Sequence, residues 1–380
     1  MKRIVVPLLC ALLAACASMP PVAPESLPSL FDDAAFAAPS ARIDPADIFA
    51  VDAEMQNFLD HDVARRVLID GQVMALVNAL YTKEHKKFSY DSVQTRNAAA
   101  VFHQRSGNCL SYTIMTAAFA KQLHLPVQFH AISYGDIWDR NDDIDFLIGH
   151  VNLTIGIKKG TSDDPAKLID FGAFEDARNE ISDDIGEDII VAMYMNNRAA
   201  EALTKNKLDD AYWWARAAIT SAPSFVGAYN TLGVIYSRHH NLIDAERVFR
   251  RTLEREPDNV LALANQVQVL TTMGRLEESQ RLQRHLTEVQ PNPPYYFFNR
   301  GMAAMRIGDY KTAKIEFTKE VNRASYNHQF HFWLALANYR LGNINETLKQ
   351  LEVAMDNSPN TEQHDLYAAK LEKLKAMNSN

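Results

Sequence analysis

The stretch from Ala228 to Asn259, AYNTLGVIYSRHHNLIDAERVFRRTLEREPDN, contains a spacing that recurs along the C-terminal half of the chain. The stretch ends just after Pro257, and a proline or serine occupies the equivalent position every 34 residues along this half of the chain. A small residue lies twelve positions before each of them. The recurring pairs are Ala211 with Pro223, Ala245 with Pro257, Ser279 with Pro291, Ala313 with Ser325, and Thr347 with Pro359. This period indicates an array of internal repeats.

The same stretch resembles the tetratricopeptide repeat, with matches at Tyr229, Leu232, Gly233, Tyr236 and Phe249. The resemblance implies an all-α superhelix of five repeats over residues 191–361, and a capping helix and tail over 362–380. It also implies a partner protein or peptide on the concave face. Six side chains of repeats four and five either line an apolar groove there or pack between helices: Phe298, Met302, Met305, Phe332, Leu336 and Tyr339.

The first half of the chain has a different pattern. Asp44 followed by Pro45 predicts a helix start, and a second helix is expected over about residues 64–81. Strand patterns follow over 126–134, 149–157 and 166–174. The two halves are expected to have independent cores, so that residues 44–190 form an α+β domain able to fold without the repeats.

Cys109 lies in RSGNCLSYTIM, residues 105–115, between a small-residue turn and an apolar run that ends before Pro126. This arrangement predicts that Cys109 begins a helix. Unpaired backbone N–H groups and the helix dipole favour a thiolate at that position. A buried, inert thiol is the alternative interpretation.

The order of residues after Cys109 points to a family. The motifs GNCLSY, GHVNLTI and LIDFGAF resemble the transglutaminase-like superfamily, whose fold is related to papain-like cysteine peptidases. The resemblance implies that Cys109 is the nucleophile, that His150 is the general base and acid, and that Asp170 orients the imidazole. It implies Gln104 as an oxyanion donor beside the Cys109 backbone N–H, with a surface role as the alternative. Structural roles for His150 and Asp170 remain open, and the aromatic residue common after the family's histidine is missing here.

The first residues resemble a bacterial lipoprotein signal. Lys2 and Arg3 precede an apolar run that is too short to span a bilayer, and Leu13-Ala14-Ala15 leads directly into a cysteine. The resemblance implies a signal peptide over residues 1–15 and lipidation of Cys16, with an ordinary secretory signal as the alternative. The Pro- and Ala-rich residues 16–43 are expected to form a flexible tether. Because Ala17 is not Asp, we expect an outer-membrane anchor that faces the periplasm.

Charge and composition narrow the partners and cofactors. The formal net charge is −8, and removal of Lys2 and Arg3 makes it −10 (37 basic against 47 acidic residues), which argues against nucleic acid. Cleavage would remove Cys10 and lipidation would use Cys16, so Cys109 would be the only free thiol. The acidic run near residues 139–145 fails the calcium-loop pattern, which requires Gly at the sixth position and Glu at the twelfth. No metal or cofactor is expected.

These patterns together predict a membrane-anchored, exported cysteine hydrolase of peptidase or amidase type, whose repeats recruit a protein substrate or partner. A protein-crosslinking transglutaminase, in which a lysine amine replaces water, is the first alternative. The second is a scaffold without catalysis, in which only the repeats act.

Overall fold

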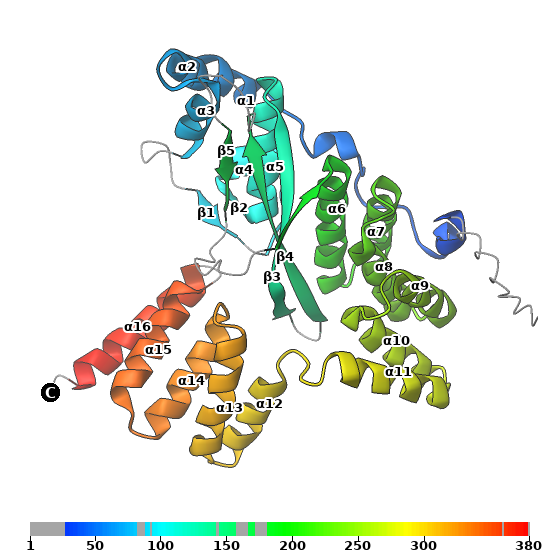
Figure 1. Ribbon diagram of the computed structural model, residues 1–380, viewed down its shortest axis with the longest axis vertical. Coiled ribbons are helices and arrows are strands. Elements are labelled where there is room, and N and C mark those ends of the chain that lie inside the picture. Colours follow the sequence, from blue (N-terminus) through cyan, green and yellow to red (C-terminus); the bar gives the residue numbers. More distant parts are fainter. Residues whose placement is uncertain are drawn as a thin grey trace, which may run out of the picture.

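The computed structural model describes residues 27–81, 88–91, 93–141, 144–156, 166–171, 181–358 and 361–378. Within them, a small mixed domain precedes a long curved array of helices (Figure 1). Cys10 and Cys16, on which the anchor prediction depends, lie outside the described residues. The same is true of the side chains of the acidic run near residues 139–145.

The segment before the mixed domain is ordered against the helix array, which corrects the prediction of a flexible tether for its last part. Short turns η1 (Leu27–Leu30) and η2 (Asp33–Ala35) lie along α7 (Leu208–Ser221) and α8 (Val226–Arg238). The Phe36 ring stacks on Tyr212 with 4.0 Å between centroids and 3° between planes. Leu30 and Phe36 are buried. Their burial holds residues 27–40 on the array.

Hydrogen bonds from side chains of α7 and α8 reinforce this contact. The Tyr236 hydroxyl donates to the Leu30 carbonyl at 2.9 Å and accepts from the Asp32 N–H at 2.9 Å. The Asp33 carboxylate accepts from the Tyr212 hydroxyl and from Arg216. These partners come from helices that lie far away in sequence, so composition alone could not reveal them.

The helical part of the mixed domain departs from prediction at two places. Asp44 caps only the short turn η3 (Pro45–Asp47), and the α-helix begins later because Asp52 caps it. The helix expected over residues 64–81 is interrupted at Gly71, whose φ of 76° lies in the left-handed region that favours glycine. The elements here are α1 (Ala53–Phe58), the π-type turn η4 (Leu59–Val63), α2 (Ala64–Asp70), α3 (Gln72–Tyr81), α4 (Ala98–Gln104) and α5 (Cys109–Gln122).

A four-stranded antiparallel sheet packs with α5, in the order β5-β4-β3-β6. The strands are β3 (Val127–Asn141), β4 (Ile144–Ile155), β5 (Lys167–Ile169) and β6 (Ile181–Ile185). The first three correspond to the predicted strands, whereas β6 was not predicted. β3 and β4 form a long hairpin that projects from the sheet (Figure 1). A separate parallel pair joins β1 (Ser89–Tyr90) to β2 (Ser106–Gly107).

The C-terminal part confirms the predicted array of antiparallel helix pairs. Among residues 187–358, antiparallel helices pair as α6 with α7, α8 with α9, α10 with α11, α12 with α13, and α14 with α15. The bounds not yet given are α6 (Glu187–Thr204), α9 (Leu242–Arg255), α10 (Val260–Thr272), α11 (Leu276–Val289), α12 (Tyr296–Arg306), α13 (Tyr310–Arg323), α14 (His328–Arg340), α15 (Ile344–Asp356) and α16 (Thr361–Asn378). The helix α16 packs on α15 at the predicted cap position.

The repeat period has a packing cause. A Cβ at Gly233 of α8 would lie 2.5 Å from the Phe249 ring of α9, and one at Gly301 of α12 would lie 2.5 Å from the Phe317 ring of α13. Both positions therefore need glycine, so that the two helices of a pair can approach closely.

The two halves share one core, contrary to the expectation of independent cores. A continuous cluster of buried side chains runs from Leu30 through the mixed domain and on to Val269 of α10. The helix α6 begins at Glu187 and packs against both β3 and α7, so the expected boundary at residue 190 falls inside a helix. Separate small clusters occupy the later repeats.

Candidate active site

Cys109 is the first residue of α5, as predicted. The Asn108 side chain caps this helix by accepting from the Ser111 N–H at 2.9 Å and from the Ser111 hydroxyl at 2.7 Å. Cys109 is 8% exposed and is a free thiol. The helix N-terminus places partial positive charge beside the sulfur.

His150 lies beside that thiol on β4 and is buried. Its Nε2 is 2.7 Å from Asp170 Oδ1, and its side chain interacts with the Cys109 thiol. Burial lowers the pKa of His150, but the hydrogen bonds to Asp170 and Cys109 outweigh it and raise the pKa to about 9. The structure therefore brings the three predicted residues together.

Asp170 reaches this position because it follows directly after β5. Leu153 of β4 pairs with Ile169 of β5, so the next residue, Asp170, lies beside Asn152. The Asn152 amide donates to Asp170 Oδ2 at 2.9 Å. The two oxygens of Asp170 are thus divided between His150 and Asn152. A carboxylate held at both oxygens fixes the orientation of the imidazole.

Asn152 was not predicted as a site residue. The absence of an aromatic residue shortly after His150 is the feature that could have drawn attention to it. Asn152 is 2% exposed, and its Oδ1 has no hydrogen-bond partner within the described part of the chain. Burial of an amide in this strand is explained by its bond to Asp170.

Gln104 does not join this group. It ends α4 and is exposed, and its Oε1 accepts from the Arg96 guanidinium at 2.7 Å. The structure therefore favours the surface interpretation of Gln104. Tyr90 of β1 lies near Cys109 instead, because β1 pairs with the turn that precedes α5. No sequence signal marked Tyr90, because its position depends on the pairing of two-residue strands.

Aromatic rings form one wall around the site. Phe171, which follows Asp170, lies 5.3 Å from Tyr81 and 5.3 Å from Tyr112 between ring centroids. Phe88 contacts Tyr81 and Tyr112 from the other side. These rings surround the first turns of α5 with apolar surface, which strengthens the electrostatic interactions within the site.

The first repeat helix contacts the cap of α5 through one threonine. The Thr95 N–H donates to Glu201 of α6 at 2.7 Å, and the Thr95 hydroxyl accepts from Asn108 at 2.9 Å. Asn197 of α6 bonds to the same hydroxyl. Burial raises the pKa of Glu201. The cap of the nucleophile helix is therefore tied to the repeat array.

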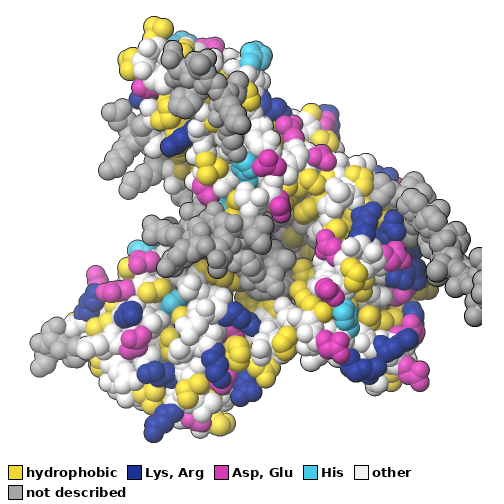
Figure 2. All heavy atoms as spheres, viewed as in Figure 1, with side chains coloured by type: hydrophobic (Ala, Val, Ile, Leu, Met, Phe, Trp, Pro, Cys, Tyr) yellow, Lys and Arg dark blue, Asp and Glu magenta, His cyan; other side chains and the backbone are white. Residues whose placement is uncertain are grey.

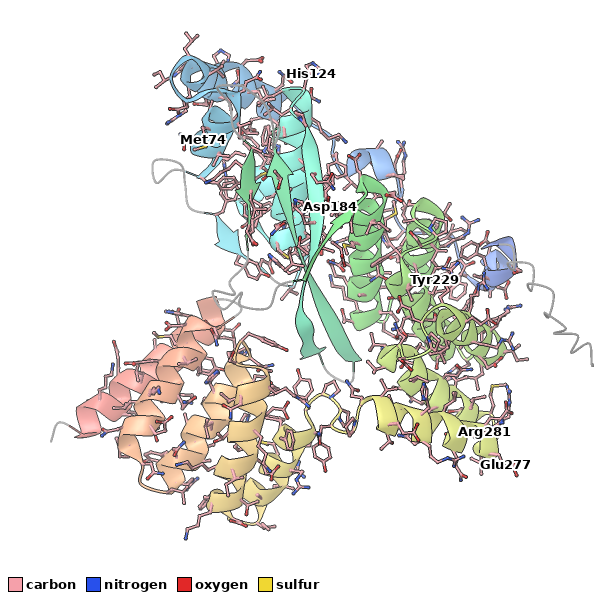
Figure 3. The ribbon with its side chains drawn as sticks, in the orientation of Figure 1. Met74, His124, Asp184, Tyr229, Glu277 and Arg281 are labelled. Carbon is pink, nitrogen blue, oxygen red and sulfur yellow. The ribbon has the colours of Figure 1, made fainter. Side chains whose placement is uncertain are left out.

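A second histidine on the same sheet has a structural role. His130 of β3 bonds through Nδ1 to Asp184 of β6 at 2.7 Å, and through Nε2 to the Thr154 hydroxyl at 2.9 Å. Asp184 is labelled in Figure 3 at the end of the sheet that adjoins α6. This pair joins the unpredicted strand β6 to β3 and β4.

In the repeats, the six predicted inner side chains pack largely between helices. Phe298 lies 5.2 Å from the Phe330 ring, and Phe332 stacks at 5.4 Å on Tyr367 of α16. Met302 and Met305 pack against the same buried cluster as Phe298, whereas Tyr339 is 39% exposed. Figure 2 shows Lys and Arg side chains interspersed with Asp and Glu over the visible face of the array.

Among the described residues, no group of three or more His, Cys, Asp or Glu side chains could hold a metal ion. Over the same part of the chain, no helix is both long enough and apolar enough to cross a membrane.

The comparison with solved structures finds tetratricopeptide-repeat proteins. A thermophilic protein of this type from Thermus thermophilus is 15% identical, with a TM-score of 0.29, covering 47% of this chain and 98% of its own. One from Parabacteroides merdae is 18% identical, with a TM-score of 0.26, covering 51% and 76%. YrrB, described as having an unusual peptide-binding site, is 20% identical, with a TM-score of 0.26, covering 47% and 92%. No family model and no curated protein matches the chain.

Proposed function

We propose that this chain is an exported cysteine hydrolase of peptidase or amidase type that acts through a thioester on Cys109. The observation that carries the proposal is the contact of thiol, imidazole and carboxylate at the N-terminus of α5. The helix-pair array would bind the protein substrate or a partner protein. Its surface carries both signs of charge, and it supplies the helix that touches the cap of α5.

The reaction follows from the residues present. The Cys109 thiolate attacks the amide carbon, forming a carbon–sulfur bond and moving the carbonyl electron pair onto oxygen. His150 then gives its proton to the departing amine, and the carbonyl re-forms as a thioester. Water, deprotonated by His150, attacks the thioester and releases the acid and the thiol. Asp170 stabilises the imidazolium throughout.

The direct test compares wild type with Cys109→Ala in the exported protein fraction. We expect new protein N-termini that depend on Cys109, because hydrolysis of an internal amide creates them. Crosslinked bands without new N-termini would instead identify the transglutaminase alternative, in which a lysine amine takes the acyl group. A Thr318→Ala variant on α13, far from the thiol in sequence and on a separate repeat, is the matched control.

A scaffold without catalysis is the second candidate. It is favoured by the low exposure of Cys109 and by an array that extends from α6 to α16. In that case iodoacetamide would modify Cys109 only after the protein unfolds. Modification of the folded protein at neutral pH, slowed by His150→Ala, would exclude this candidate.

The proposal includes a lipid anchor on Cys16, with the protein at the outer membrane and facing the periplasm. A Cys16→Ser variant should leave the membrane fraction or accumulate as an uncleaved precursor, because the acylation site is gone. Labelling with a fatty-acid analogue measures this directly. Wild-type protein without attached lipid in the soluble exported fraction would contradict the anchor and leave the hydrolase proposal intact.

A further inference from the structure

Thr95 lies in the loop before α4, yet only 3% of its surface is exposed. Its polar groups are bound by α6, the first helix of the repeat array. The backbone N–H donates to Glu201 Oε1 at 2.7 Å, and the backbone carbonyl accepts from Arg198 Nη1 at 3.3 Å. The hydroxyl accepts from Asn197 Nδ2 at 3.1 Å. The helix α6 therefore binds both backbone groups and the side chain of one loop residue.

The carboxylate that binds the Thr95 N–H is itself fixed in place. The Glu201 side chain is 13% exposed, and its second oxygen accepts from Arg198 at 2.5 Å. Buried polar groups are stable in a protein when each has a partner, and here both carboxylate oxygens have one. Glu201 therefore sets the position of Thr95 relative to α6.

The other side of the same loop holds the cap of α5. Asn108 Nδ2 donates to the Thr95 hydroxyl at 2.9 Å, while its Oδ1 accepts from the Ser111 N–H. The backbone N–H of Arg96 donates to the Ser111 hydroxyl at 2.9 Å. Because the Ser111 N–H must meet an oxygen, the amide nitrogen of Asn108 is directed to Thr95. Asn108 immediately precedes Cys109, so continuous hydrogen bonds lead from α6 to the turn that carries the thiol.

We propose that Glu201 is a positioning residue for Cys109, and that the repeat array in this way forms part of the catalytic site. This inference rests on the proposed function. Glu201 fixes Thr95, and Thr95 fixes the amide of Asn108, which caps the first turn of α5. His150 comes from a different element, β4, so its contact with the thiol depends on where that turn lies. Figure 1 shows α6 beside the mixed domain, and α6 packs on both α5 and β3.

The test measures the rate at which iodoacetamide labels Cys109 in the folded, full-length protein. Glu201→Leu removes the acceptor for the Thr95 N–H and should slow labelling about tenfold, the effect typical of one hydrogen bond to a charged group. Combined with His150→Ala, the same substitution should change the rate less than about twofold, because no imidazole is left for the thiol to meet. A purely structural role predicts the opposite sign, since a weakened fold exposes the buried thiol more often and speeds its labelling.

A conservative variant and a matched control accompany this measurement. Glu201→Gln keeps an oxygen for the Thr95 N–H and should recover most of the rate lost in Glu201→Leu. Glu187, also on α6, pairs with Lys121 near the other end of α5 at 2.6 Å, and these side chains are 44% and 42% exposed. Glu187→Leu therefore removes a carboxylate from the same helix without touching the cap, and it should leave the labelling rate unchanged.

Thr95 provides the same test from the other end of the connection, and it decides the matter if Glu201→Leu does not fold. Thr95→Val keeps the N–H that Glu201 binds but removes the hydroxyl that accepts from Asn108. It should show the same loss of rate, again only when His150 is present. Thr95→Ser keeps the hydroxyl and should recover most of that loss.

The remaining outcomes would count against the inference. Equal slowing by Glu201→Leu with and without His150 would overturn it, as would a labelling rate that is unchanged or faster. Labelling as slow in Glu201→Gln as in Glu201→Leu would also overturn it, because the acceptor is then present. If His150→Ala alone leaves the wild-type rate unchanged, the proposed hydrolase itself fails, and that result is distinct because it involves no change in α6.

Discussion

His150 is buried beside Cys109 and has a strongly raised pKa. Its pKa is raised to about 9 from a reference of 6.5, so the folded protein holds this proton more tightly than the unfolded chain does. The resulting stabilisation is fully present below pH 6.5 and is lost as pH rises through about 9. A shift of this size corresponds to about 3 kcal/mol.

We predict that His150→Gln is less stable than wild type at pH 6, and that the difference shrinks steadily toward pH 9.5. Urea unfolding at pH 6, 7.5 and 9.5 measures the free energy of unfolding of both proteins. His61→Gln on the exposed turn η4 is the control for a histidine without these partners. A difference that stays constant with pH would contradict the assigned hydrogen bonds to Asp170 and Cys109.

Asn152 is expected to act through Asp170. The Asn152→Leu variant keeps the volume of the side chain but removes the donor to Asp170 Oδ2, so the carboxylate is less well oriented. A hydrogen bond to a charged group contributes about 1.5 kcal/mol, and we therefore predict about a tenfold slower alkylation of Cys109 at neutral pH. The effect should be smaller than that of His150→Ala.

The pH dependence of the Cys109 alkylation rate distinguishes a positioning role of Asn152 from a simple loss of protein stability. In Asn152→Leu the rise of the alkylation rate should shift along the pH axis, because the imidazolium that supports the thiolate is less stable. Thr154→Val, two residues along β4, removes a buried hydroxyl that bonds to His130 instead. The same profile shift in Thr154→Val would assign the Asn152 effect to the strand as a whole.

Local signals predicted single elements well. The start of α5 at Cys109 was evident because a small-residue turn precedes it and an apolar run follows it. The helix pairs were evident because a small residue and a proline or serine recur with a period of 34 residues. Two of the pairs also share a close contact between glycine and phenylalanine, Gly233 with Phe249 and Gly301 with Phe317. Signals of this kind act within a few residues or within one repeat.

Contacts set by pairing between distant segments could not be predicted. Asp170 meets Asn152 only through the register of β4 and β5, and Tyr90 lies opposite Gly107 only through the pairing of β1 with β2. Gly71 was hidden inside an apolar periodic run, although its left-handed backbone breaks the helix. Strand register depends on the whole sheet, and a one-residue shift moves every side chain to the opposite face.

The packing of residues 27–40 on the helix array can be tested by substitution. Phe36 is 6% exposed and stacks on Tyr212, so Phe36→Ala leaves a cavity against α7. We predict a loss of about 3 kcal/mol in the free energy of unfolding, measured by urea denaturation. Ala38→Ser, at an exposed position two residues later, should change it little. A Phe36→Ala protein as stable as wild type would show that the segment is only loosely held.

The shared core predicts how the chain responds to truncation. A protein ending at residue 190 lacks most of α6, including buried Met195 and Leu203, and it loses the bond from Thr95 to Glu201. We predict that it fails to form a cooperative fold. A protein ending at residue 290 keeps the continuous core through Val269 and should unfold in a single transition.

Circular dichroism during thermal unfolding compares the two lengths. Iodoacetamide labelling of Cys109 adds a local measure, since the thiol in the longer protein should keep its dependence on His150. A cooperative transition for the protein ending at residue 190 would mean that α6 contributes little to the mixed domain.

The docking of residues 27–40 on α7 and α8 limits how far the helix array can lie from the membrane. With a lipid on Cys16, as proposed, only residues 17–26 separate the bilayer from the fixed segment. A fully extended chain of that length spans about 35 Å. This short linker would hold the first two helix pairs, α6 with α7 and α8 with α9, close to the membrane. Its substrates would be proteins that come to the bilayer surface, and distant soluble proteins would meet the thiol only after diffusing there.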